Sequence, residues 1–317
     1  MAHVAVHAMG PGDHYAAAPR WRPLAPSLAL GTLGATCVLI ILGGLVTNTG
    51  AALAVPDWPS TFGYNIVLFP WSRMVGGILY EHSHRLMGAL VGVLTLALAG
   101  ALLWEGGRLR WLGLIAVAVV VAQGVLGGLR VILLDDTLAI FHGCLAQAFF
   151  ALLAVISLLT ARRGRVATQP VEPPIKRVAA VAPGLVYVQI VFGALLTHAG
   201  RIDLHLAGAV LVFVLIPIVA ALLRRTDDAI AVPVSRLVTI RLGVQLLLGI
   251  GSFLALLADL DAGRAAHGDR PAGRASTGRQ PHSCRHGRPR GTSVEGRFAR
   301  AAGPAWRWQY VIRTGAG

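Results

Sequence analysis

The segment Tyr80–Gly88, with the sequence YEHSHRLMG, places ionisable side chains at the start of an apolar run that continues to about Trp104. A charged group at the centre of a membrane helix costs roughly 2.5–3.5 kcal/mol on insertion scales, so its presence there indicates function. Glu81 and His84 are three residues apart and share one face of a helix, whereas His82 points elsewhere. The segment therefore predicts a membrane helix whose first turns carry a functional site.

The composition identifies the class of protein. The 317 residues are 55% hydrophobic and only 13% charged, against about 25% charged residues in soluble domains. The net charge of +14 does not point to nucleic acid, because eleven of the 28 Lys and Arg residues follow Leu260 and most others lie in short loops between apolar runs. Three cysteines without ligand spacing support neither a zinc site nor a disulfide framework.

Apolar runs long enough to cross a bilayer set the expected fold class, an all-α polytopic membrane bundle. The Lys and Arg residues outside these runs lie mainly in the N-terminal arm and in alternate loops. By the positive-inside rule this places the N-terminus in the cytoplasm. Seven runs are found, near residues 27–48, 76–104, 111–130, 138–160, 178–197, 203–223 and 235–257.

The runs form an internal repeat. Gly43–Gly50 at the end of the first run resembles Gly193–Gly200 at the end of the fifth, and His84 opens the second run as His205 opens the sixth. Gln-x-x-x-Gly spacings recur in the third, fifth and seventh runs. We interpret the chain as two four-helix halves in parallel order, which predicts an eighth helix that the sequence lacks.

The expected organisation follows from this repeat and from a change in composition. After about Asp259 the chain becomes rich in Arg, Gly, Ala and Pro, and we expect a disordered tail there. We interpret this tail as an out-of-frame or otherwise aberrant C-terminus that replaces the last helix. The predicted parts are a cytoplasmic arm (1–26), a first four-helix half (27–160), a cytoplasmic linker (161–177), an incomplete second half (178–257) and the tail (258–317).

Three histidines, His84, His142 and His205, lie at similar shallow depth on helices that enter from the outer face. Neutral imidazoles on facing helices suit a metal or an axially ligated haem. A zinc or di-iron centre normally needs more carboxylates or thiolates than this region offers. Haem is therefore the favoured ligand, and Arg85, Arg130 and Arg201 are either propionate partners or snorkelling interfacial residues.

Residues 46–63, VTNTGAALAVPDWPSTFG, followed by Tyr80–Arg85, resemble the haem A synthase family of cytochrome oxidase assembly proteins. The resemblance covers about residues 27–257. It implies an eight-helix enzyme of the bacterial inner membrane that oxidises the C8 methyl of haem O to the formyl of haem A. A haem O synthase and the oxidase assembly machinery are the implied partners, beside the lipid bilayer, and a homo-oligomer is left open.

The resemblance also implies residue roles. His84 and His142 would be the axial pair for substrate haem, and Glu81 the acidic residue of the oxidation. His205 would hold a haem b cofactor, with a second ligand from the missing eighth helix. His198 is a substitute candidate for that ligand, and His82 is a candidate for the surroundings of the first haem. The loop after the first helix lacks the cysteine pair of some members, so we expect no redox role for that loop.

Glu81 has two alternative states, a general base with a pKa raised by burial or an ion-pair partner of Arg85. The function also has alternatives. The chain could be a bis-histidine haem b electron carrier without substrate chemistry, a transporter with histidine proton relays, or an inactive truncated family member.

Overall fold

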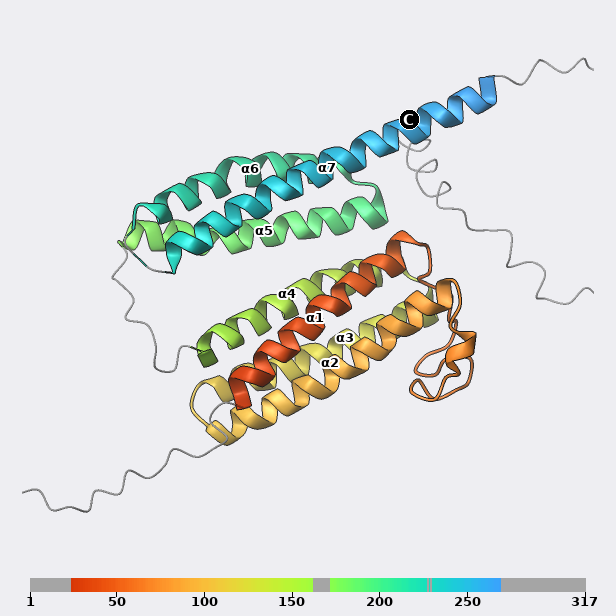
Figure 1. Cartoon of the computed structure of the whole chain (residues 1–317), viewed down its shortest axis with the longest axis horizontal. Helices are drawn as coiled ribbons and strands as arrows, with labels where there is room; N and C mark the ends of the chain where they lie inside the picture. The colour runs from red at the N-terminus through yellow and green to blue at the C-terminus, as the bar shows by residue number, and fades with distance from the viewer. Residues whose placement is uncertain (1–23, 162–171, 227, 229, 269–317) are drawn as a thin grey trace, which may run out of the picture. The chain divides into compact units, whose positions relative to one another are not determined.

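The computed structural model describes residues 24–161, 172–226, 228 and 230–268. Within them the chain forms seven α-helices and one short 3-10 helix, η1 (Trp71–Arg73), and all seven helices are long and apolar enough to cross a membrane (Figure 1). The predicted all-α polytopic membrane bundle is confirmed. The helices are α1 (Leu24–Asn48), α2 (Gly77–Glu105), α3 (Leu109–Leu133), α4 (Asp136–Ala161), α5 (Pro173–Ala199), α6 (Ile202–Arg224) and α7 (Ala231–Gly268).

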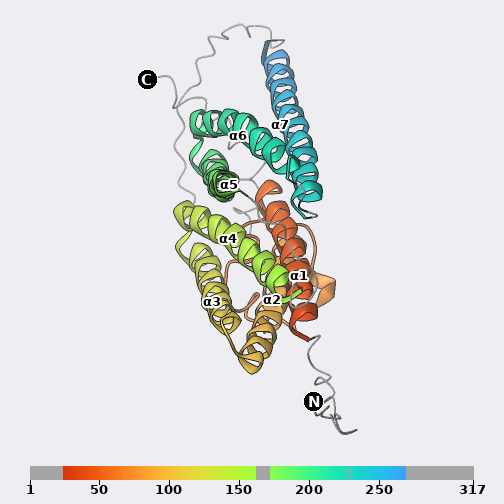
Figure 2. The same cartoon turned by 90° about the vertical axis from the view of Figure 1, so that its left-hand side faces the viewer.

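The first compact unit, which extends to Arg165, contains a closed bundle of α1–α4. Each helix packs on the next one in sequence, and α1 also packs on α4 (Figure 2). Since lipid tails are as apolar as leucine, close packing rather than transfer from water stabilises such a bundle. Gly113 shows this, because an added Cβ would lie 3.2 Å from Cα of Ala99 on α2. The buried core consists of Ala25, Ala29, Val91, Leu98, Leu102, Ala116, Phe149, Leu153 and Ile156.

The second unit, from Val166 onward, contains α5–α7, with α6 packed against both of its neighbours. Helix α5 begins at Pro173, inside the predicted linker 161–177, because proline is preorganised for the first helical positions. Helix α7 continues to Gly268, so residues 258–268 are not the disordered tail that we expected. Alanine and leucine favour the helix there. The rest of the predicted tail, 269–317, lies outside the described residues.

Candidate functional site

His84 and His142 face each other inside the first bundle. His84 lies near the start of α2 and His142 in the second turn of α4, and their ring centres are 6.4 Å apart with an angle of 67° between the rings. A metal–imidazole bond is about 2 Å long, so two imidazoles on opposite sides of one iron have ring centres roughly 6 Å apart. The spacing of this pair therefore fits axial ligation of a haem iron.

Glycines on the neighbouring helices make room for both rings. A Cβ on Gly43 of α1 would lie 3.2 Å from Nε2 of His84, and a Cβ on Gly127 of α3 would lie 3.1 Å from Cε1 of His142. Both distances are tighter than ordinary van der Waals contact. Arg130, at the end of α3, is near enough to act electrostatically on both imidazoles. The predicted His84–His142 pair is thus brought together, with Arg130 beside it.

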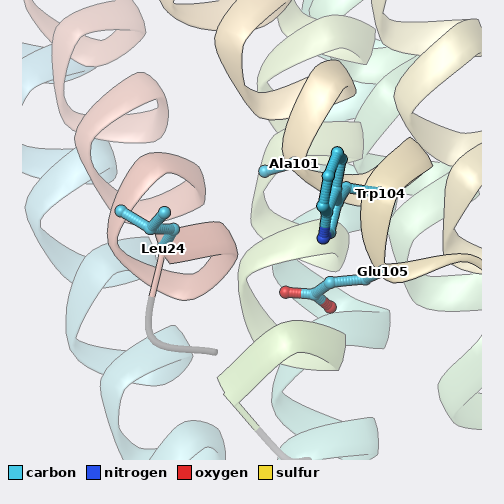
Figure 3. A pocket seen from close by; sticks show the side chains of 4 residues that line it. All are labelled: Leu24, Ala101, Trp104 and Glu105. Carbon is cyan, nitrogen blue, oxygen red and sulfur yellow. The ribbon is translucent and has the colours of Figure 1, made fainter. Parts of the chain in front are cut away.

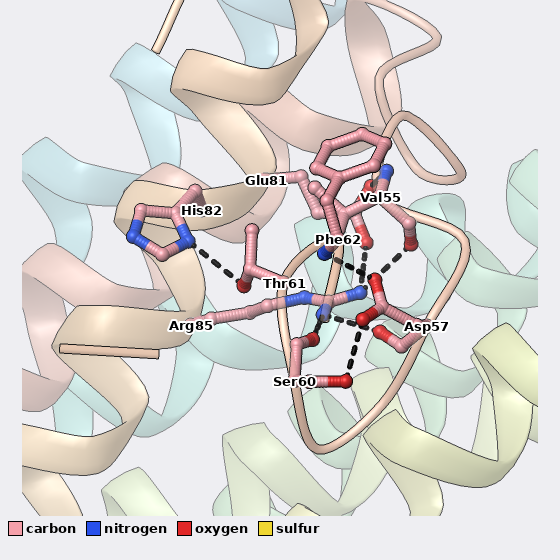
Figure 4. A network of polar contacts seen from close by, with 8 residues as sticks. All are labelled: Val55, Asp57, Ser60, Thr61, Phe62, Glu81, His82 and Arg85. Carbon is pink, nitrogen blue, oxygen red and sulfur yellow. Dashed lines mark hydrogen bonds and ion pairs between the residues drawn. The ribbon is translucent and has the colours of Figure 1, made fainter. Parts of the chain in front are cut away.

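Arg85, one residue after His84, fastens the loop between α1 and α2 to α2. Its Nη1 donates hydrogen bonds to the carbonyls of Asp57 at 2.6 Å and Ser60 at 2.9 Å. Its Nη2 donates to the carbonyl of Val55 at 2.9 Å and to Oε1 of Glu81 at 2.7 Å (Figure 4). All four acceptors are protein atoms, so the geometry favours a loop anchor over the propionate contact considered for Arg85.

Glu81 is buried, with only 4% of its surface exposed. Its Oε1 pairs with Arg85 one turn later in α2, and its Oε2 accepts a 2.9 Å hydrogen bond from the main-chain N–H of Val55. Of the two states that the sequence left open, the structure has the ion pair. Both carboxylate oxygens face the loop through these contacts, rather than standing free beside His84.

His82 belongs to the same loop anchor and not to the histidine pair. Its Nδ1 lies 3.1 Å from the hydroxyl of Thr61, and its ring packs at 4.9 Å on Phe69. The expectation that His82 and His84 point apart is correct. The assignment of His82 to the surroundings of the haem receives no support, because its contacts are with the loop (Figure 4).

Asp57 shapes the loop from within. Its carboxylate accepts hydrogen bonds from the hydroxyl of Ser60 at 2.5 Å and from the N–H groups of Phe62 at 2.7 Å and Gly63 at 2.9 Å. Burial raises the pKa of Asp57, but these hydrogen bonds outweigh it and hold the pKa below its usual value of 3.8. The Asp57 side chain thus has a structural role in the loop.

Trp58, next to Asp57, packs against α3 and so joins the loop to that helix. A Cβ added to Gly128 would overlap the indole ring of Trp58. Gly128 directly follows Gly127, the glycine that faces His142. The loop thus contacts α2 through Arg85 and α3 through Trp58, close to the positions that hold the histidine pair.

In the second unit, His205 in the first turn of α6 contacts α5. Nε2 of Gln189 lies 3.2 Å from Nδ1 of His205 and donates to its main-chain oxygen at 3.1 Å. A Cβ on Gly193 would lie 3.7 Å from the ring, an ordinary contact. His198 lies in the last turn of α5, so one short connection separates it from His205.

Arg201, the third arginine considered for a propionate, has an acid partner that sequence reasoning missed. It forms two hydrogen bonds with the carboxylate of Asp203, at 2.9 and 2.7 Å, in an exposed pair at the start of α6. An exposed pair of this kind contributes little to stability, because solvent screens both charges. Arg201 is therefore already paired with a protein carboxylate.

One family match covers most of the first unit, α5 and the start of α6. The family model COX15-CtaA, described as cytochrome oxidase assembly protein, matches residues 26–205. This is more than half of the chain, and it contains Glu81 and all three predicted haem ligands. The chain belongs to this cytochrome oxidase assembly protein family, the haem A synthase family. No curated protein matches the chain, and no solved structure matches it.

A small hollow lies at the far end of α2 in this haem A synthase family member. It is lined by Leu24, Ala101, Trp104 and Glu105 (Figure 3). Trp104 is 20 residues beyond His84, about 30 Å along the helix at 1.5 Å per residue. The hollow is therefore separate from the histidine pair.

Sequence reasoning missed two glutamines in this cytochrome oxidase assembly protein. Gln123 donates a 3.0 Å hydrogen bond to the main-chain oxygen of His142, as Gln189 does to that of His205. The signal was present, because the Gln-x-x-x-Gly spacing recurs along the chain. It was used only as a mark of the repeat, since the sequence does not show which helix each glutamine faces.

Proposed function

We propose that this chain is an oxidoreductase that converts haem O into haem A, with His84 and His142 as the axial ligands of the substrate. The observation that carries the proposal is the pair of facing imidazoles with ring centres 6.4 Å apart, one turn from the buried Glu81–Arg85 pair. The family's role in cytochrome oxidase assembly supports the substrate class. A haem O synthase would supply the substrate.

The reaction takes the methyl group and one water to a formyl group, four protons and four electrons. Haem, when bound, supplies the iron centre and the conjugated ring that share the charge of the oxidised substrate. The family resemblance implies a haem b cofactor, which His205 would hold and which would supply a redox centre for these electrons. The second ligand of that haem b is assigned to His198 as a candidate.

Glu81 is the proposed acidic residue of the oxidation. Its carboxylate, held by Arg85, could take a proton from the reacting methyl group or stabilise positive charge that develops on the substrate. Buried charges act more strongly than exposed ones because little water screens them. Arg85 positions Glu81 and fastens the loop to α2.

One observation favours a second function, a bis-histidine haem b electron carrier without substrate chemistry. Both oxygens of Glu81 already accept hydrogen bonds, from Arg85 and from Val55. A carrier needs only the two imidazoles and a slot for the ring, and it makes no use of a free carboxylate.

Co-expression with a haem O synthase, followed by chromatography of the extracted haems, separates the two functions. The enzyme accumulates haem A, and Glu81→Ala retains bound haem but loses the haem A product. A carrier binds haem, gives a bis-histidine spectrum and forms no haem A. A purified chain that contains no haem in a pyridine haemochrome assay contradicts both functions and favours a transporter or an inactive member.

A further inference from the structure

A glutamine on one helix hydrogen-bonds to a histidine on the next at two places in the chain. Nε2 of Gln123 on α3 donates to the main-chain oxygen of His142 at 3.0 Å, and Nε2 of Gln189 on α5 donates to that of His205 at 3.1 Å. The residue four positions after each glutamine is a glycine that faces the imidazole ring. The same three-part arrangement thus occurs in both units.

The other end of each amide is unused. Oε1 of Gln123 and Oε1 of Gln189 are buried and have no hydrogen-bond partner among the described residues. Nδ1 of His142 is also buried and has no hydrogen-bond partner within the described part of the chain. A buried polar atom without a partner costs about 1–3 kcal/mol. Gln123 and His142 are already joined by a hydrogen bond, and each also has a buried polar atom, Oε1 and Nδ1, without a partner in the ranges that the structure describes. We therefore expect these two atoms to pair when the histidine binds a ligand.

Gln189 shows that the amide can reach the ring nitrogen. Its Nε2 lies 3.2 Å from Nδ1 of His205, and rotation of the amide would bring Oε1 to the same place. An imidazole bound to a metal through one nitrogen almost always donates the N–H of its other nitrogen to an acceptor, which fixes the tautomer and raises the basicity of the ligand. A glutamine Oε1 is such an acceptor.

We propose that Gln123 is a positioning residue for the haem ligand His142, and that its Oε1 accepts a hydrogen bond from the Nδ1–H when Nε2 binds iron. Gln189 is placed to hold His205 in the same way once its amide turns so that Oε1, rather than Nε2, faces Nδ1. This inference rests on the proposed haem binding. His84 has no equivalent support from α1, because the residue four positions before Gly43 is Leu39, so the two axial ligands of the first haem are held unequally.

The test is a redox titration and a haem-binding titration of the purified full chain, with EPR of the oxidised form. Gln123→Leu removes the acceptor at similar volume, so the midpoint potential rises and haem affinity falls by about 10–100-fold. Gln123→Glu brings a stronger, charged acceptor, so the midpoint potential falls. Gln245→Leu is the matched control, because Gln245 has the same spacing to Gly249 but is exposed on α7, and it leaves the potential unchanged.

Opposite shifts of the midpoint potential in the two Gln123 variants support the inference. If Gln123 only joined α3 to α4, both variants would lose that contact and shift the potential in the same direction. Equal shifts, or lower thermal stability with an unchanged potential, overturn it. A wild-type chain that binds no haem overturns the proposed function and this inference together. A wild-type chain that binds haem, with Gln123→Leu identical to it, overturns the inference alone.

Discussion

The main-chain N–H of Val55 donates a 2.9 Å hydrogen bond to the carboxylate of Glu81, across 26 residues of sequence. This bond joins the loop after α1 to the helix that carries His84. Glu81 therefore serves the loop as well as the proposed chemistry. Any substitution at this position has to be judged by both effects, which is why the predictions below separate loop stability from haem chemistry.

Arg85→Gln should loosen the loop and leave Glu81 as a buried charge without its partner. Removing one member of a buried ion pair typically costs about 3–5 kcal/mol, and the side chains of Arg85 and Glu81 are only 9% and 5% exposed. We expect a lower unfolding temperature in detergent and faster proteolysis within residues 49–76.

Arg73→Gln is the control for Arg85→Gln in the same loop. Arg73 is exposed and contacts the ring of Tyr64 at 5.7 Å. An exposed cation–π contact is worth about 0.5–1 kcal/mol, so this change should have a small effect. Equal effects of the two substitutions would contradict the anchor role of Arg85.

Gly127→Ala should weaken haem binding at the histidine pair. The new methyl group would lie 3.1 Å from Cε1 of His142, so the imidazole has to move by a few tenths of an ångström. We expect a shifted optical spectrum and faster loss of haem to a scavenger such as apomyoglobin. Gly124→Ala on the same helix meets nothing within 4 Å and should bind haem as the wild type does. An unchanged Gly127→Ala protein would show that the ring position is not limiting.

Gly128→Ala should displace Trp58 from α3. The added methyl group overlaps the indole, and overpacking of this kind costs typically about 1–3 kcal/mol. In a Trp58→Ala protein, Gly128→Ala should be nearly neutral, because the indole that the added methyl group would meet is gone. A double-mutant cycle on thermal unfolding measures this coupling. Additive effects of the two changes would mean that Trp58 does not rest on Gly128.

The sequence predicted the membrane helices well because apolar runs of about 20 residues have few alternatives in a bilayer. It also placed His84 and His142 together, since matched depth on facing helices limits where they can lie. It could not assign Arg85, whose four acceptors include three main-chain carbonyls of a loop, and the positions of carbonyls in a loop leave no mark in the sequence. The same limit applies to Val55 and Glu81.

Boundaries were less predictable than helices. The end of α7 was set at residue 257 from the change in composition, yet the helix continues to Gly268. Composition marks where a chain stops being apolar, whereas a helix ends where its backbone hydrogen bonds end. The distinction matters most where an apolar helix runs into a polar sequence of good helix formers.

His84→Met should change the optical spectrum of the bound haem, because it replaces an axial imidazole with a thioether. His82→Met should leave that spectrum nearly unchanged and instead loosen the loop, since His82 contacts Thr61 and Phe69. The two readouts are the spectrum and the proteolysis rate of residues 49–76. Equal spectral changes in both variants would contradict the separation of His82 from the histidine pair.

Acid should loosen the loop through Asp57. The folded-state pKa of Asp57 is held below its usual value of 3.8, so its ionisation stabilises the fold fully above that value. This contribution is lost as the pH falls through the lower, folded-state pKa, because the protonated carboxyl is a poorer acceptor for Ser60, Phe62 and Gly63. We expect the proteolysis rate within residues 49–76 to rise as the pH falls below about 4. Asp57→Asn should be loosened already at neutral pH and should lack this acid-dependent step, and an identical pH profile for both proteins would exclude Asp57 as the titrating group.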